Sequence, residues 1–274
     1  MICAWNALLS ILPARLKSPV DSIGNAILQE LRLRINAPPE LVLANGIRNV
    51  SGNVSREEIN YIINAASQYS PWCASSLSHG YLTAPGGHRI GVCGYSIQKD
   101  GVISGIREIT SVCIRIARDF PGIGKQASVR NQSILVLGAP GWGKTTLLRD
   151  IIRNISSEET VCVVDERGEL FPDGFPRGKR VDVMSGCPKR IGMDMLLRTM
   201  APQYIALDEI TEEADCESLL KIANCGVRLL ATAHACTKED FYTRPIYKKL
   251  AAGNVFDTLI ILKKNKTYSV ERIA

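Results

Sequence analysis

The stretch LGAPGWGKTTLLRD, residues 137–150, constrains the fold more than any other part of this sequence. Gly138 and Gly143 enclose four residues and are followed by Lys144 and Thr145, which is the spacing of a phosphate-binding loop. The apolar run SILVLG before it predicts a strand, and the periodic apolar residues after it predict a helix. Backbone N–H groups of such a loop, together with the helix N-terminus, can surround phosphate oxygens. We therefore expect ATP to be bound by Gly138, Ala139, Pro140, Gly141, Trp142, Gly143, Lys144, Thr145 and Thr146.

Three further apolar runs predict the rest of a parallel sheet. TVCVVDE, YIALDE and VRLLATAH are almost continuously apolar, as strands buried on both faces are, and helical patterns separate them. The final stretch, residues 254–274, predicts a hairpin at the sheet edge. We expect this part of the chain to be an α/β, RecA-like P-loop ATPase domain with a mainly parallel sheet.

The first part of the chain follows a different pattern. SREEINYIINAASQ begins with a capping box, Ser55 to Glu58, and predicts a helix, while the Asn45-Gly46 pair predicts a hairpin turn. The alternating runs YLTA, HRIGVCGYSI and TSVCIRIA predict an antiparallel sheet. The expected organisation is a smaller α+β domain at 1–122, a linker at 123–130 and the P-loop domain at 131–274.

Acidic residues and a histidine follow the predicted parallel strands. Asp165 and Glu166 follow one strand, Asp208 and Glu209 another, and His234 a third. The carboxyl ends of parallel strands line one crevice, so these side chains should face the same nucleotide as the loop. Hydrolysis needs a carboxylate that directs Mg²⁺ and a group that orients the attacking water.

Each of these residues has an expected role. Mg²⁺ is expected to be held by Thr145, by Asp208 through water and by Asp165. Lys144 should bridge the β and γ phosphates, and Glu209 should polarise the attacking water. An imidazole at 234 could contact the γ-phosphate or the catalytic acid. The expected catalytic residues are thus Lys144, Glu166, Glu209 and His234.

The composition sets limits on location. With 274 residues and 46% hydrophobic content, the chain can bury a sizeable core, and no apolar run has the length of a transmembrane helix. Nine cysteines without a CxxC pair indicate free thiols in a reducing compartment, so we expect a cytoplasmic protein. The apolar start MICAWNALLSIL predicts a packed helix; the alternative is a surface for lipid or a partner formed by Trp5, Leu8, Leu9 and Leu12.

A group of strings resembles a known class of protein. These are LQELRLRINAPPELV, HGYLTAPGGHRIGVCGYSI, IREITSVCIRIAR, GAPGWGKTTLLRD, VVDERGEL, RTMAPQYIALDEI and ATAHA. In this order they resemble the P-loop ATPases of type II and type IV secretion and pilus assembly and, among these, the stage III sporulation AA family of endospore-forming bacteria. The resemblance covers most of the chain. One departure is Gly168, where a serine is more familiar.

The resemblance implies a function and an assembly. It implies an ATPase that powers assembly of, or transport through, the channel between mother cell and forespore. It also implies a homo-oligomeric ring, expected to be a hexamer, in the mother-cell cytoplasm. Such a ring would be peripheral to the membrane and attached through membrane-embedded sporulation channel proteins.

Ring ATPases usually complete their site with an arginine, because its rigid fork of donors suits the charge of the transferred phosphate. The candidates are Arg89, Arg115 and Arg118 in the first domain and Arg167 beside the acidic strand end, with Arg115 favoured. The basic segment PRGKRVDVMSGCPKR is either a solvated insertion or a contact surface.

Two alternatives to a motor stay open. A net charge of +6 permits a P-loop protein that handles nucleic acid, although a nucleic-acid partner is not expected. A scaffold that binds ATP and assembles with little turnover is the other alternative.

Overall fold

The computed structural model describes residues 1–68, 77 and 80–273. His79, which begins one of the compared strings, lies outside the described residues. The chain divides into two compact units, Met1–Asp119 and Phe120–Ala274. The segment predicted as a linker, 123–130, falls in the second unit, where Ala127 is fully buried in the core.

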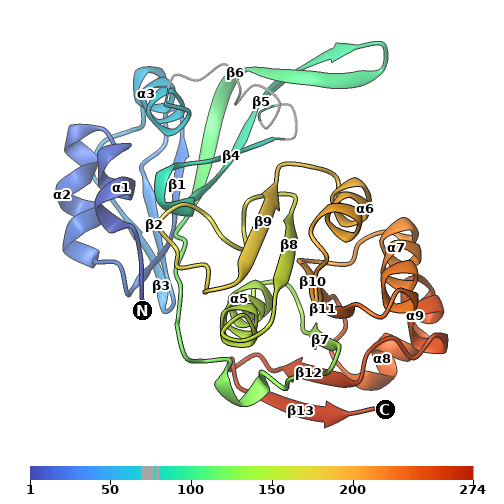
Figure 1. Cartoon of the computed structure of the whole chain (residues 1–274). Helices are drawn as coiled ribbons and strands as arrows, with labels where there is room; N and C mark the ends of the chain where they lie inside the picture. The colour runs from blue at the N-terminus through green and yellow to red at the C-terminus, as the bar shows by residue number, and fades with distance from the viewer. Residues whose placement is uncertain (69–76, 78–79, 274) are drawn as a thin grey trace. The chain divides into compact units, whose positions relative to one another are not determined.

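The first unit is an α+β unit built on a six-stranded sheet in the order β3-β2-β1-β6-β5-β4 (Figure 1). All neighbouring strands are antiparallel, as predicted. The strands are β1 (Leu28–Arg34), β2 (Glu40–Leu43), β3 (Gly46–Asn49), β4 (Tyr81–Thr83), β5 (Arg89–Lys99) and β6 (Val102–Arg115). The helices are α1 (Trp5–Ser10), α2 (Ala14–Ile23) and α3 (Arg56–Ala66), with the short helix η2 (Pro85–Gly87).

Local sequence signals in this unit are confirmed. Helix α3 begins with both hydrogen bonds of the Ser55–Glu58 capping box and buries its predicted apolar face. A hairpin joins β2 to β3, with Leu43 paired to Gly46. The apolar N-terminus packs on its own unit, since Leu8 and Leu12 are fully buried in the core. Neither residue is therefore part of an exposed apolar surface.

The second unit carries a seven-stranded sheet in the order β13-β12-β7-β11-β10-β8-β9. The pairs from β12 through β9 are parallel, and only β12 and β13 are antiparallel. Its strands are β7 (Ile134–Leu137), β8 (Val161–Asp165), β9 (Val181–Ser185), β10 (Tyr204–Leu207), β11 (Arg228–Ala233), β12 (Thr258–Leu262) and β13 (Tyr268–Arg272). Its helices are α5 (Lys144–Ile155), α6 (Lys189–Thr199), α7 (Glu213–Asn224), α8 (Lys238–Thr243) and α9 (Lys248–Ala252), with η3 (Lys125–Ala127) and η4 (Pro245–Tyr247).

Helices cover both faces of this sheet. Alternate residues of β7 enter two separate cores: Ile134 and Val136 pack with α5, whereas Leu135 and Leu137 belong to the core that includes α6, α7 and α9. This two-sided burial explains the continuous apolar runs of the central strands. The predicted α/β fold with a mainly parallel sheet is confirmed.

The sequence did not predict β9. This strand lies at the sheet edge inside the basic segment 176–190, and all five of its residues are half-buried or exposed. An edge strand with little burial does not need an apolar run, so its sequence resembles a solvated loop. Within the described ranges, no helix has both the length and the apolar character that crossing a lipid bilayer requires.

Candidate active site

The phosphate-loop residues connect β7 to α5. Gly141 and Gly143 have φ angles of +76° and +103°, which favour glycine because a Cβ atom is strained there. Helix α5 starts at Lys144 without a side-chain cap and without an acidic residue in its first turn. The N–H groups of a helix start lack partners within the helix, so this end can accept an anion. The loop therefore fits the phosphates of a nucleotide.

The ammonium of Lys144 lies over this loop. Its Nζ donates hydrogen bonds to the carbonyl of Ala139 at 3.3 Å and to Nδ1 of His234 at 3.2 Å. Burial lowers the pKa of Lys144, and the negative charges of Asp208 and Glu209 oppose that effect. The ammonium of the loop lysine thus contacts both its own loop and the residue that follows β11.

His234 connects Lys144 to Glu209. Because Nδ1 accepts from the lysine, the ring proton lies on Nε2, which contacts Oε1 of Glu209. Arg167 lies on the other side of that carboxylate, with its Nη1 3.5 Å from Oε2. Burial raises the pKa of Glu209, but the hydrogen bond from His234 and the charges of Arg167 and Lys144 outweigh it. The pKa of Glu209 is therefore below its usual value, and the side chain is a carboxylate.

The carboxylate of Asp208 accepts hydrogen bonds from two hydroxyl groups, one at the start of α5 and one on β11. Thr145 Oγ1 donates to Oδ2 at 2.6 Å, and Thr232 Oγ1 donates to Oδ1 at 2.7 Å. Burial raises the pKa of Asp208, and the two hydroxyl hydrogen bonds counteract it. Among the described residues, no three His, Cys, Asp or Glu side chains form a cluster that could hold a metal. Thr145 and Asp208 instead fit the usual protein share of a Mg²⁺ site, which completes its shell with water and substrate phosphates.

Asp165 is the last residue of β8, and its side chain is bonded to the turn that follows this strand. Its carboxylate is 2% exposed and accepts the backbone N–H groups of Glu169, Leu170 and Phe171 at 2.8–3.0 Å. Burial raises the pKa of this carboxyl, and the backbone hydrogen bonds oppose it. Asp165 therefore holds the turn after β8 and also lines the small polar cavity that Asp208 and Glu209 border, so its role in holding Mg²⁺ stays a prediction.

Glu166 lies beside a small cavity near Glu209. The cavity has a volume of about 20 Å³, which is room for one water molecule. Its lining includes Glu166, Arg167, Lys189, Asp208 and Glu209. The Glu166 carboxylate is 3.9 Å from the ammonium of Lys189. Both acidic strand ends thus reach one polar cavity.

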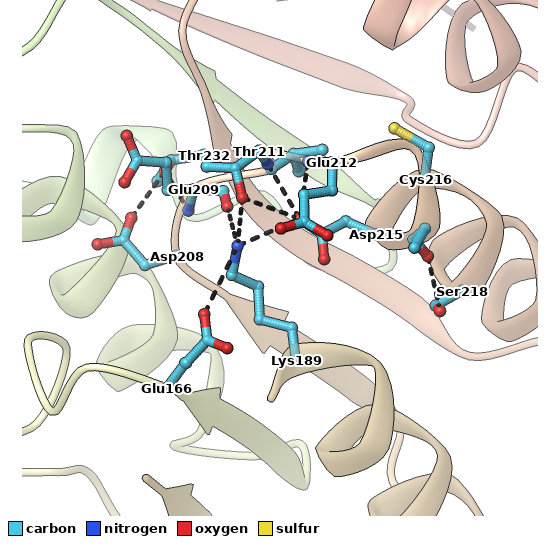
Figure 2. A network of polar contacts seen from close by, with 12 residues as sticks. Glu166, Lys189, Asp208, Glu209, Thr211, Glu212, Asp215, Cys216, Ser218 and Thr232 are labelled. Carbon is cyan, nitrogen blue, oxygen red and sulfur yellow. Dashed lines mark hydrogen bonds and ion pairs between the residues drawn. The ribbon is translucent and has the colours of Figure 1, made fainter. Parts of the chain in front are cut away.

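Two residues in this region were missed by the sequence argument. Thr232 accepts the N–H of Glu209 at 2.8 Å in addition to its bond with Asp208. Lys189 belongs to the basic segment predicted as either a solvated insertion or a contact surface, but it is buried and bonded to three different groups (Figure 2). The sequence did contain a signal for Thr232, because this residue places a hydroxyl group within the otherwise apolar run LLATAH. The sequence around Lys189 contains no comparable signal.

The candidate arginines of the first unit differ in what they contact. Arg118 donates to the carbonyls of Asn25 and Leu28, and Arg89 lies 4.6 Å from the ring centre of Tyr81. Arg115 has a side chain that is 67% exposed, and its Nε is 3.4 Å from Glu30. Arg118 and Arg89 have local structural roles, so Arg115 is the better candidate of the three.

The comparisons with known proteins identify the family and agree with the fold. Residues 6–272 match the family described as Sporulation stage III, protein AA. The chain is 34% identical to stage III sporulation protein AA of Bacillus subtilis (strain 168), over 95% of this chain and 92% of that protein. It is 31% identical to the uncharacterized protein ycf45 of Cyanidium caldarium, over 60% of this chain and 53% of that one.

Two solved structures share the fold. The pilus retraction motor PilT with bound ADP superposes with a TM-score of 0.64 at 14% identity, over 95% of this chain and 82% of PilT. The ATPase DotB of Yersinia pseudotuberculosis gives a TM-score of 0.63 at 15% identity, over 96% and 79% of the two chains. The chain therefore shares its fold with the pilus retraction motor PilT and the ATPase DotB.

Proposed function

Since this chain belongs to the family Sporulation stage III, protein AA, we propose that it is a magnesium-dependent ATPase that works in sporulation. The observation that carries the proposal is the continuous contact from Lys144 through His234 to Glu209. It links the loop that would hold the phosphates to the carboxylate that would orient the attacking water. The fold shared with PilT and DotB supports the same reaction class.

The residues divide the work of hydrolysis as follows. The N–H groups at the start of α5 and the Lys144 ammonium bind the β and γ phosphates. Thr145 and Asp208 are the residues that would hold Mg²⁺, Asp208 through water, and the metal would neutralise charge that develops on the phosphates. Glu209, kept ionised by its neighbours, accepts the hydrogen bond of the attacking water. Glu166 borders the cavity in which a water fits.

We further propose that the protein works as a homo-oligomeric ring, with Arg115 of one subunit completing the site of the next. The hydrolytic cycle would power assembly of, or transport through, the channel between mother cell and forespore. The ring would lie in the mother-cell cytoplasm and bind membrane-embedded channel proteins. The name of the Bacillus subtilis relative supports the link to sporulation, and the likeness to the pilus motor supports a motor.

The decisive variant is Glu209→Gln. It removes the charge that orients water but keeps the shape of the side chain, so ATP affinity should stay within about threefold while turnover falls by at least about 100-fold. ATP affinity is measured with a fluorescent analogue, and turnover by phosphate release with Mg²⁺. Glu217→Gln is the matched control, because Glu217 is an exposed glutamate of α7 paired with Lys249.

Three outcomes would count against the proposal. Wild-type turnover in Glu209→Gln would remove Glu209 from the chemistry. Normal spores formed by that variant would favour a nucleotide-gated scaffold. A chain that stays monomeric with a non-hydrolysable ATP analogue, as measured by light scattering, would exclude the ring.

A further inference from the structure

Lys189 is a buried cation that the proposed chemistry does not use. It is the first residue of α6 and is only 8% exposed. We propose that Lys189 is a positioning residue that fixes the backbone of Glu209 and thereby the direction of its carboxylate. This inference rests on the proposed function, because Glu209 needs a fixed direction only if it orients the attacking water.

The contacts of the Lys189 ammonium carry the proposal. Its Nζ donates to the backbone carbonyl of Glu209 at 2.7 Å, to Oγ1 of Thr211 at 2.9 Å and to Oδ2 of Asp215 at 3.1 Å (Figure 2). These acceptors use the three protons of an ammonium group. Lys189 therefore joins the backbone of Glu209 to the start of α7, where Asp215 also accepts the N–H groups of Thr211 and Glu212.

Glu209 has a backbone conformation that needs support. Its φ angle is +59°, in the left-handed region that residues with a Cβ atom rarely occupy. The backbone N–H of Glu209 donates to Thr232, and its backbone carbonyl accepts from Lys189. Both backbone polar groups of Glu209 are therefore hydrogen-bonded to side chains. Strained residues persist when their surroundings fix them, and they concentrate at functional sites. Without Lys189, the backbone carbonyl of Glu209 loses this hydrogen bond.

The position of Lys189 depends on a close contact between α6 and β8. A Cβ atom at Gly192 would lie 2.8 Å from Cγ1 of Val164 and 2.8 Å from Sγ of Cys187. Glycine at this position lets α6 approach β8 closely, which brings the start of α6 to the carboxyl ends of the strands. The same approach places the ammonium 3.9 Å from Glu166. Lys189 therefore contacts both acidic strand ends that border the small cavity.

The first test compares turnover in variants. Lys189→Met alone leaves Asp215 as a buried carboxylate without its cation, which can unfold the chain. Lys189→Met/Asp215→Asn removes both charges and is the working variant; Asp215→Asn alone keeps the bond from Lys189 to Glu209. We expect kcat of the double variant to fall by about 100-fold with KM for ATP changed by less than about threefold. In Asp215→Asn alone, kcat should fall much less. Lys221→Met, at an exposed lysine of α7, is the matched control.

A second comparison shows whether Lys189 acts through Glu209. In a Glu209→Gln background, single-turnover rates should change by less than about threefold when Lys189→Met/Asp215→Asn is added. A full additional loss of about 100-fold would mean that Lys189 acts elsewhere. A double variant that keeps wild-type kcat would also overturn the proposal.

An NMR measurement separates this inference from the proposed function. The chain has three histidines, so the imidazole ¹³C spectrum of the full chain is simple. His234 contacts Glu209, and its signals should move in Lys189→Met/Asp215→Asn, whereas those of His88 in the first unit should stay. Unmoved His234 signals would overturn the positioning role even if the wild type hydrolyses ATP. Moved signals would support it even if no hydrolysis is found, in which case the proposed function alone fails.

Discussion

The hydroxyl of Thr145 donates a hydrogen bond of 2.6 Å to Oδ2 of Asp208, which joins the first turn of α5 to the end of β10. The proton of Thr145 is thereby directed toward the carboxylate, and a lone pair of Oγ1 is left for a cation.

Asp208→Asn should raise the Mg²⁺ concentration for half-maximal turnover by about tenfold or more, because a hydrogen bond to a charged group is worth about 1.5–3 kcal/mol. Phosphate release is measured against Mg²⁺ at fixed ATP. Asp194→Asn is the control, since Asp194 is a half-exposed aspartate of α6 paired with Lys221. An unchanged Mg²⁺ requirement in Asp208→Asn would remove Asp208 from the metal site.

Asp165→Asn should have a different effect, because the structure uses this carboxylate to accept three backbone N–H groups. An amide accepts with one oxygen only, so buried N–H groups lose a partner and the free energy of unfolding should fall by about 1–3 kcal/mol. Urea unfolding measures the stability, and the magnesium titration described above measures the metal site. If Asp165→Asn instead raised the Mg²⁺ requirement tenfold and left the stability unchanged, the result would support the predicted role of Asp165 in holding Mg²⁺.

The meeting of Thr145, Asp208, Glu209 and His234 could be predicted from the sequence for one physical reason. Thr145 lies in the first turn of the helix that follows β7, the other three follow β10 or β11, and the carboxyl ends of parallel strands share one edge. The buried strands were recognisable from their apolar runs, so the edge and its residues followed. What the sequence could not give was the direction of each side chain, such as that of Asp165 toward its own turn.

Lys189 could not be predicted because its burial depends on contacts between distant residues. It lies in the basic segment 176–190, which contains four other basic residues and is typical of a solvated loop. Its position follows from the approach of α6 to β8 at Gly192, and a single glycine in a helical pattern does not identify its neighbour. The left-handed backbone of Glu209 is likewise invisible in the sequence.

The stability of the first unit should depend on pH through His88. This histidine is fully buried; its Nδ1 accepts the N–H of Ala117 at 3.2 Å, and Nε2 donates to the carbonyl of Ala4 at 3.0 Å. Burial lowers the pKa of His88, with the Arg118 charge acting in the same direction and the Ala4 hydrogen bond opposing it. Below the ordinary pKa of 6.5, the unfolded chain binds a proton that the folded chain does not. The free energy of unfolding should therefore fall as pH decreases below about 6.5, by at most about 1.4 kcal/mol per pH unit.

Urea unfolding between pH 7.5 and 5.5 tests this dependence. A Trp142→Phe background removes the tryptophan of the second unit, so the remaining tryptophan fluorescence reports on the first. His88→Gln should be less stable than this background at pH 7.5, because a buried hydrogen bond is lost, but its stability should vary less with pH. Equal pH dependence in the two proteins would show that His88 is not the titrating group.

Arg115 is the residue expected to act across subunits in the proposed ring. Its side chain is largely exposed and makes a long contact with Glu30, so it can contact a neighbouring subunit. If it stabilises the charge of the transferred phosphate there, Arg115→Ala should lower kcat by about 1,000-fold, with ATP affinity within about threefold. Arg107→Ala, at an exposed arginine of the same strand, is the control and should keep wild-type turnover.

Mixing the Arg115→Ala and Glu209→Gln chains shows whether Arg115 acts on the neighbour. Each chain alone lacks one part of every site, whereas in a mixed ring about a quarter of the sites combine an intact Glu209 with an intact Arg115 from the next subunit. Turnover should therefore recover to about a quarter of the wild-type rate at equal amounts of the two chains. A mixture that assembles but stays as inactive as its components would mean that Arg115 acts within its own subunit or outside the site. The Arg115→Ala rate measured alone then separates these two cases, because only a residue within the site lowers kcat at saturating ATP.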